Sequence, residues 1–137
     1  MSDGLDVSPT WPIFTLKLTH EHTGMEILKE CVSRPLDIIF VCCGGGGMLA
    51  GIAAYVKRVR PTVKVIGVEA ADAAGMTESL RAGEVVTLDS VGLFADGAAV
   101  KTIGKETFRV CSKLVDDMVT VSTDQICNAI KLSYNDA

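Results

Sequence analysis

Four consecutive glycines are the part of this sequence best suited to chemistry. Gly44, Gly45, Gly46 and Gly47 follow an apolar run at 36–43 and precede a second apolar run at 48–56. Because glycine has no Cβ and accepts positive φ, the backbone N–H groups of such a loop can converge on an anion where a helix begins. We therefore expect a phosphate-binding loop. A tight turn without a ligand is the alternative, although a turn does not require four glycines and the conformational entropy that they lose.

Two common nucleotide-binding patterns fit this loop less well. A P-loop places lysine after its last glycine, but here Met48 and Leu49 follow, which disfavours ATP or GTP chemistry. A loose pattern through Gly45, Gly47 and Gly51, with Glu69 one strand later, would suit a dinucleotide. A nicotinamide-binding half-domain is therefore an alternative.

The elements that must position the loop are a strand before it and a helix after it. The run 36–43 is apolar almost throughout and stops at glycine, which predicts a central parallel strand buried on both faces. A helix is predicted over 48–58 and a second strand over 63–69. The loop then lies at the carboxyl end of a strand, where open α/β sheets bind their ligands.

The rest of the chain continues this alternation. Thr23 and Glu26 have the spacing of a capping box and predict a helix from 23 to about 33. In residues 13–18, apolar and polar side chains alternate as they would in a short strand. Further helices are predicted over 73–82, closed by Gly83, and over 104–114 and 122–134, with a strand at 117–121 and an irregular functional loop at 84–104. The predicted fold class is α/β, a doubly wound parallel sheet.

Composition disfavours several classes of partner. The 137 residues are 48% hydrophobic and 22% charged, which is typical of a globular domain. A net charge of −4 argues against nucleic acid and anionic membranes, and no apolar stretch approaches the ~20 residues of a membrane span. No targeting segment is visible.

Neither cysteines nor histidines form a recognisable metal pattern. The 5 cysteines are an odd set without CxxC spacing, so we expect reduced, structural thiols in a reducing compartment. His20 and His22 have no clear third ligand nearby. No metal site is predicted.

Several stretches, taken together, resemble the fold-type II pyridoxal-phosphate enzymes, and within them the biosynthetic threonine ammonia-lyases (threonine dehydratases). They are TGMEI at 23–27, DIIFV at 37–41 leading into the glycines, KVIGVEA at 64–70, VGLFADGAAVK at 91–101 and GKETF at 104–108. The glycine loop alone is not specific for this family, but the combination of these stretches in the order found in the family is. The resemblance implies a partial tryptophan synthase β-like catalytic domain at 23–137, after an unmatched segment at 1–22.

The resemblance also implies a cofactor, pyridoxal 5'-phosphate, and residues that contact it. The family binds the cofactor phosphate through the backbone amides of its tetraglycine loop, matched here by Gly44, Gly45, Gly46, Gly47 and Met48. A stretch beside the cofactor ring is matched by Ala95, Asp96 and Gly97, although Asp96 could instead cap its own turn. Some relatives hold a divalent cation near the position of Glu69, but the second carboxylate is missing here, so no metal is implied.

One functional element of the family does not appear. The family takes its Schiff-base lysine from a Ser-x-Asn-x-Lys type motif upstream of the glycines, but only Lys17 and Lys29 precede Gly44, and neither lies in such a motif. No catalytic residue is therefore assigned. The chain resembles an internal fragment that is expected to be inactive alone.

The resemblance implies a function for the parent enzyme: conversion of threonine, with serine as a second substrate, to a 2-oxo acid and ammonia, as a step of isoleucine biosynthesis. It implies a soluble intracellular protein, cytoplasmic or, in a plant, plastidic, and is compatible with a homo-oligomer. A catalytically dead ligand-binding or regulatory paralogue is the alternative.

Overall fold

The computed structural model describes the backbone of residues 14–135 and the side chains of residues 21–135. Its centre is a parallel sheet in the order β1-β2-β3, formed by β1 (Ile38–Cys42), β2 (Lys64–Ala70) and β3 (Asp117–Val121). The register places Val41 beside Gly67, and Gly67 beside Met118. The parallel α/β class predicted from the sequence is confirmed.

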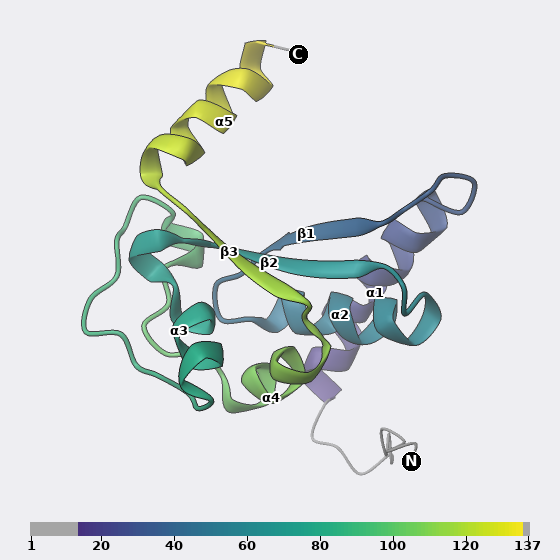
Figure 1. The fold of residues 1–137 in the computed structure, drawn as a ribbon, viewed down its shortest axis with the longest axis horizontal. Coiled ribbons are helices and arrows are strands. Elements are labelled where there is room, and N and C mark those ends of the chain that lie inside the picture. The colour runs from purple at the N-terminus through teal and green to yellow at the C-terminus, as the bar shows by residue number, and fades with distance from the viewer. Residues whose placement is uncertain (1–13, 136–137) are drawn as a thin grey trace.

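Helices cover one side of this sheet. In Figure 1, α1 (Phe14–Glu30), α2 (Gly47–Val59), α3 (Gly75–Ala82) and α4 (Lys105–Leu114) lie below the strands, whereas α5 (Thr123–Asn135) extends away from them. Two short 3-10 turns, η1 (Ala71–Ala73) and η2 (Asp96–Ala98), interrupt the connections. No helix among the described residues combines the length and the apolar character needed to cross a membrane.

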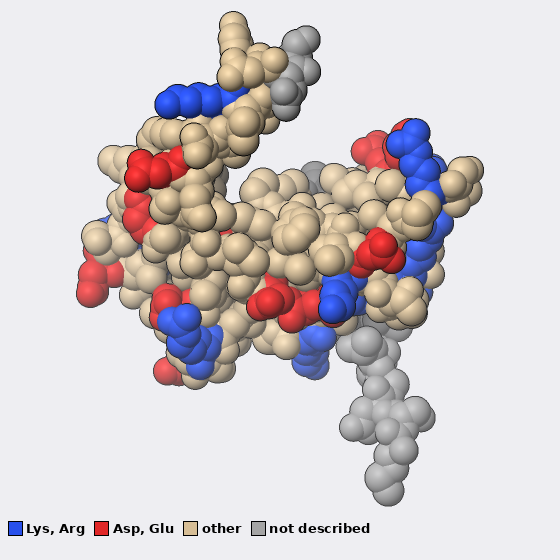
Figure 2. Space-filling view, turned by 45° about the horizontal axis from the view of Figure 1, so that its top comes forward, with Lys and Arg blue, Asp and Glu red and all other residues tan. Residues whose placement is uncertain are grey.

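The core lies between the helices and the sheet, and the other face of β1 is open. Along β1, Ile39 and Val41 are buried, whereas Ile38 is 43% and Phe40 63% exposed. The prediction that this strand is buried on both faces is therefore wrong for the described residues, because the helices there pack against one face. Figure 2, turned to show the upper side of the sheet, displays a largely uncharged surface with acidic and basic side chains interspersed at its margins.

Helix α1 differs most from its prediction. It begins at Phe14 and continues through Thr23 to Glu30, so the strand at 13–18 and the helix start at Thr23 are both wrong. The reason is packing against α2: a Cβ on the buried Gly24 would lie 3.3 Å from Cα of Ile52. Gly24 therefore marks a close crossing of two helices and not a helix end.

The remaining boundaries follow local sequence signals. Helix α3 ends at Gly83, whose φ of 77° is the left-handed C-cap expected of glycine. Helix α5 begins with a capping box, in which Gln125 N–H donates to Ser122 Oγ (3.2 Å) and Ser122 N–H donates to Gln125 Oε1 (2.8 Å). Residues 84–104 are irregular apart from η2 and a bridge between Thr87 and Thr102, as predicted.

Candidate anion-binding site

The four glycines join the carboxyl end of β1 to the N-terminus of α2. Gly46 is the N-cap residue of α2, and no side chain caps the helix there. Within residues 14–135, no protein acceptor takes a hydrogen bond from the backbone N–H groups of Gly44, Gly45, Gly46, Gly47 or Met48. These donors, at the positive end of the α2 dipole, are left for an external acceptor, which an anion can provide.

Packing explains why glycine is needed at two of these positions. Gly46 has φ 87°, and a Cβ there would lie 2.5 Å from Cε of Met76 and 3.2 Å from Cβ of Thr107. A Cβ on Gly44 would lie 3.1 Å from the backbone Cα of Ala98. Gly45, by contrast, is exposed and has nothing within 4 Å of its Cβ position. The loop is therefore held at Gly44 and Gly46 and open at Gly45.

Thr107 of α4 makes the polar contact that holds the loop. Its hydroxyl Oγ1 lies within hydrogen-bond distance of two carbonyls, that of Gly45 at 2.9 Å and that of Gly104 at 2.8 Å. Sequence reasoning did not single out this residue, although it lies in the GKETF stretch at 104–108. A hydroxyl residue in the first turn of a helix was the only local signal.

The second predicted segment, residues 95–97, lies next to the glycine loop. Gly44 contacts Ala98, which belongs to the same turn as Ala95, Asp96 and Gly97. In this turn, Ala98 N–H donates to the Ala95 carbonyl at 2.8 Å. Asp96 is exposed, and its side chain does not cap the turn, so the capping alternative is not observed. The fold thus brings together the two loops that the sequence singled out, while the roles of their residues remain predictions.

Glu69 serves the fold at a neighbouring strand end. Its buried carboxylate accepts hydrogen bonds from Met76 N–H (2.8 Å), Thr77 N–H (2.9 Å) and Thr77 Oγ1 (2.7 Å). It therefore caps the N-terminus of α3. A ribose-binding acid must offer its oxygens to a ligand, so the nicotinamide interpretation is not supported.

Two buried thiols lie behind the loop. Burial, and then the nearby Glu69 carboxylate, raise the pKa of the Cys43 thiol far above its ordinary value. The same two causes raise the pKa of the Cys111 thiol to about 12. Both thiols are therefore protonated at neutral pH, and the five cysteines, all among the described residues, are free in this structure.

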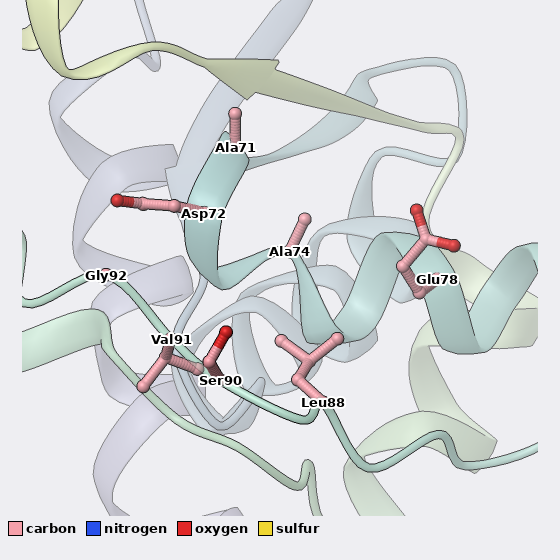
Figure 3. A pocket seen from close by; sticks show the side chains of 8 residues that line it. All are labelled: Ala71, Asp72, Ala74, Glu78, Leu88, Ser90, Val91 and Gly92. Atoms are coloured by element: carbon pink, nitrogen blue, oxygen red, sulfur yellow. The ribbon is translucent and has the colours of Figure 1, made fainter.

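The described residues also form an open pocket of about 510 Å³ outside this site. It lies between the η1–α3 segment and the strip 88–92, toward which the Leu88 and Ser90 side chains rise in Figure 3. None of the predicted site residues lines it. Among the described residues, no group of three or more His, Cys, Asp and Glu side chains is arranged to hold a metal.

The geometry fits the phosphate of pyridoxal phosphate. A row of uncommitted N–H donors at a helix N-terminus can bind a phosphate group, and a side chain at Gly44 or Gly46 would collide with the surroundings of the loop. Comparison with known proteins identifies the family of the chain. The family described as "Pyridoxal-phosphate dependent enzyme" matches residues 7–137.

Among individual proteins, the chain is similar to biosynthetic threonine dehydratases. The chain is 56% identical over 113 residues to a biosynthetic L-threonine dehydratase of Burkholderia multivorans, covering 82% of this chain and 22% of that protein. It is 59% identical over 108 residues to a chloroplastic biosynthetic threonine dehydratase of Arabidopsis thaliana, covering 79% of this chain and 18% of that protein. The chain therefore spans about a fifth of the curated relatives it matches.

A solved structure has a similar fold. The processed form of threonine deaminase isoform 2 from Solanum lycopersicum superposes with a TM-score of 0.81 at 42% identity, covering 85% of this chain and 33% of that chain. The loop geometry, the sequence match and the fold lead to one conclusion: this chain belongs to the pyridoxal-phosphate-dependent enzyme family.

Proposed function

We propose that this chain is the cofactor-phosphate-binding part of a threonine ammonia-lyase, which converts L-threonine to 2-oxobutanoate and ammonia. The observation that carries the proposal is the set of uncommitted N–H groups from Gly44 to Met48, in a chain 56% identical over 113 residues to a biosynthetic L-threonine dehydratase. The substrate is thus a small amino acid, threonine and secondarily serine. The proposal includes the assignment to isoleucine biosynthesis and leaves nucleic acid and membranes without a role.

In this proposal the chain's own residues bind and orient the cofactor. The amides of Gly44, Gly45, Gly46, Gly47 and Met48 hold the phosphate, supported by the positive end of α2. Ala95, Asp96 and Gly97 would lie near the cofactor ring, and the position of Ala98 in the same turn, 3.1 Å from a Cβ built on Gly44, supports this role. Bound pyridoxal phosphate supplies an electron sink that stabilises a carbanion at the amino acid Cα.

No residue of this chain is assigned as the lysine that joins the cofactor covalently. Lys29 is exposed on α1, and Lys57 is held by Asp116 at 2.7 Å. Lys101 Nζ donates to the carbonyl of Asp89 at 3.3 Å. We therefore expect that these 137 residues alone do not deaminate threonine.

A chimera tests whether the segment is competent. Its matching residues would replace the corresponding segment of the Burkholderia multivorans enzyme, to which they are 56% identical. We expect the purified chimera to form 2-oxobutanoate from L-threonine, and more slowly from L-serine the analogous 2-oxo acid. A folded chimera that binds pyridoxal phosphate but leaves both amino acids unchanged would contradict the assignment.

A matched pair of variants at Gly45 ties that activity to the loop. Gly45 has open space around its Cβ position, so the fold should tolerate a side chain there. Gly45→Asp adds a negative charge beside the phosphate, whereas Gly45→Asn adds a neutral side chain of similar size. We expect Gly45→Asp to weaken cofactor binding much more than Gly45→Asn does, and equal effects would argue against a phosphate in the loop.

A second function, a catalytically dead paralogue that holds a phosphate-bearing ligand, is favoured by one observation. The N–H donors of the loop need no lysine to bind an anion. An inactive chimera that still binds inorganic phosphate and pyridoxal phosphate with similar affinity would favour this role.

A further inference from the structure

We propose that Thr107 is a positioning residue that aims the Gly46 N–H group at the bound phosphate by holding the carbonyl of Gly45. The inference rests on the proposed function, because it takes the glycine loop to bind a phosphate. It adds a residue from α4 to a site otherwise built from the β1–α2 connection and the turn at 95–98.

The first step concerns the single proton of the Thr107 hydroxyl. Two carbonyls lie within reach, that of Gly45 at 2.9 Å and that of Gly104 at 2.8 Å. The Gly104 carbonyl also accepts the N–H of Phe108 at 2.9 Å, whereas no other donor in the described part of the chain reaches the Gly45 carbonyl. The bond to Gly45 thus gives a partner to a carbonyl that otherwise has none there, while Gly104 is satisfied without it.

The second step follows from the planarity of the peptide group. No peptide bond of the described chain is cis, so the carbonyl of Gly45 and the N–H of Gly46 point in opposite directions. Drawing the carbonyl toward α4 turns the N–H away from α4. A peptide between two glycines has little intrinsic preference for one orientation, so the contact from Thr107 selects it.

The third step is that Thr107 is itself well fixed. Its side chain is buried, 8% exposed, and its Cβ lies 3.2 Å from the Cβ position of Gly46. Met76 of α3 packs against the same glycine. Thr107 therefore combines a hydroxyl that orients a peptide with a hydrocarbon part that packs against the next residue, and valine can replace the second property but not the first.

Substitutions that separate these two properties test the proposal on the full 137-residue chain. Thr107→Val keeps the shape and removes the hydroxyl, and Thr107→Ser keeps the hydroxyl. Thr102→Val is the matched control, because the Thr102 hydroxyl bonds to Thr87 Oγ1 at 3.0 Å in the exposed bridge. The measurements are calorimetric titrations with pyridoxal phosphate and with inorganic phosphate, and the amide NMR shift of Gly46 on adding phosphate.

We expect Thr107→Val to weaken binding of both ligands by about tenfold, the equivalent of one hydrogen bond, and to reduce the Gly46 shift. Thr107→Ser and Thr102→Val should bind within about threefold of the unaltered chain. If Thr107 contributed only to stability, Thr107→Val would lower the unfolding temperature but leave the amide shift of Gly46 on adding phosphate unchanged, so Thr107→Ser would have no lost shift to restore. Thr107→Ala, a second variant without the hydroxyl, gives the same test if the valine variant does not fold.

The outcomes separate the two proposals. Failure of the unaltered chain to bind either ligand would overturn the phosphate-loop assignment and this inference with it. Binding by the unaltered chain that Thr107→Val and Thr107→Ala retain in full, with an unchanged Gly46 shift, would overturn the role of Thr107 alone.

Discussion

The Cβ position of Gly46 lies 2.5 Å from Cε of Met76, a contact closer than real Cβ atoms make. Met76 is fully buried and comes from α3, whose N-terminus is tied to Glu69 at the end of β2. Gly46 has φ 87° at the start of α2. The conformation of the glycine loop is therefore set by neighbouring strands and helices as well as by its own sequence.

Gly46→Ala should destabilise the fold and weaken phosphate binding. Alanine in the left-handed region costs about 1–2 kcal/mol, and the added methyl must also displace Met76 and press on Thr107. Gly83→Ala is the control, because Gly83 has a similar φ of 77° but nothing within 4 Å of its Cβ position. Urea unfolding and phosphate titration of both variants measure the difference. Equal losses of stability and unchanged binding in the two would show that packing around Gly46 is unimportant.

Glu69→Gln should destabilise the chain by about 1–3 kcal/mol, because an amide cannot accept at both ends the hydrogen bonds that α3 donates. Glu78→Gln is the matched control, since Glu78 pairs with Arg81 on the surface, where its side chain is 43% exposed. That change should alter the free energy of unfolding by less than about 0.5 kcal/mol. Similar unfolding midpoints for the two variants would be inconsistent with a capping role for Glu69.

Local signals in the sequence predicted much of this fold. Apolar runs predicted β1 and β2, the glycine at 83 marked the end of α3 correctly, and the helix predicted over 122–134 is α5. The capping-box spacing of Thr23 and Glu26 did not mark a helix start. Helix α1 continues through Thr23, because it packs closely on α2 at Gly24.

Contacts between distant residues could not be predicted in this way. Thr107 and the Gly45 carbonyl are 62 positions apart in the chain, and no periodicity links them. Glu69 resembled a ligand-binding acid at a strand end, and only its hydrogen bonds with α3 revealed a structural role. The sequence thus located the loop, whereas the residues that hold it required the tertiary structure.

Asp116 should make stability depend on pH in the acid range. Partial burial alone would raise the pKa of this carboxyl, but hydrogen bonds from Lys57 Nζ and from Val65 N–H outweigh it and hold the pKa below its ordinary value. A carboxyl with a lowered pKa in the folded state stabilises the protein above the unfolded pKa of about 3.9, and the contribution is lost as the pH falls through the folded pKa.

Asp116→Asn should therefore flatten the fall in unfolding free energy below about pH 4. Asp117→Asn is the control, since Asp117 Oδ1 accepts a local hydrogen bond from Met118 N–H. Urea unfolding from pH 7 to pH 3 compares them. A pH profile that Asp116→Asn leaves as steep as that of the unaltered chain would argue against this ion pair.

The cysteines should differ sharply in reactivity. Iodoacetamide reacts with thiolates, so Cys43 and Cys111, buried and with raised pKa, should resist it in the native chain, whereas the exposed Cys42 should react first. Mass spectrometry after short labelling at pH 8 measures this order, and the urea-unfolded chain should lose it. Rapid native labelling of Cys111 would mean that the packing behind the glycine loop opens readily.

The last prediction concerns the covalent chemistry that the chain does not contain. After incubation with pyridoxal phosphate and reduction with borohydride, mass spectrometry should find no lysine modified in every molecule, because none lies in the lysine motif of the family. Exposed lysines should show weak labelling that free lysine in the buffer suppresses. The control is Gly45→Asp, which should not change this background, since the labelling does not depend on the loop. A stoichiometric adduct at one position that Gly45→Asp abolishes, for example at Lys105 two residues before Thr107, would instead show that this chain supplies its own cofactor lysine beside the phosphate loop.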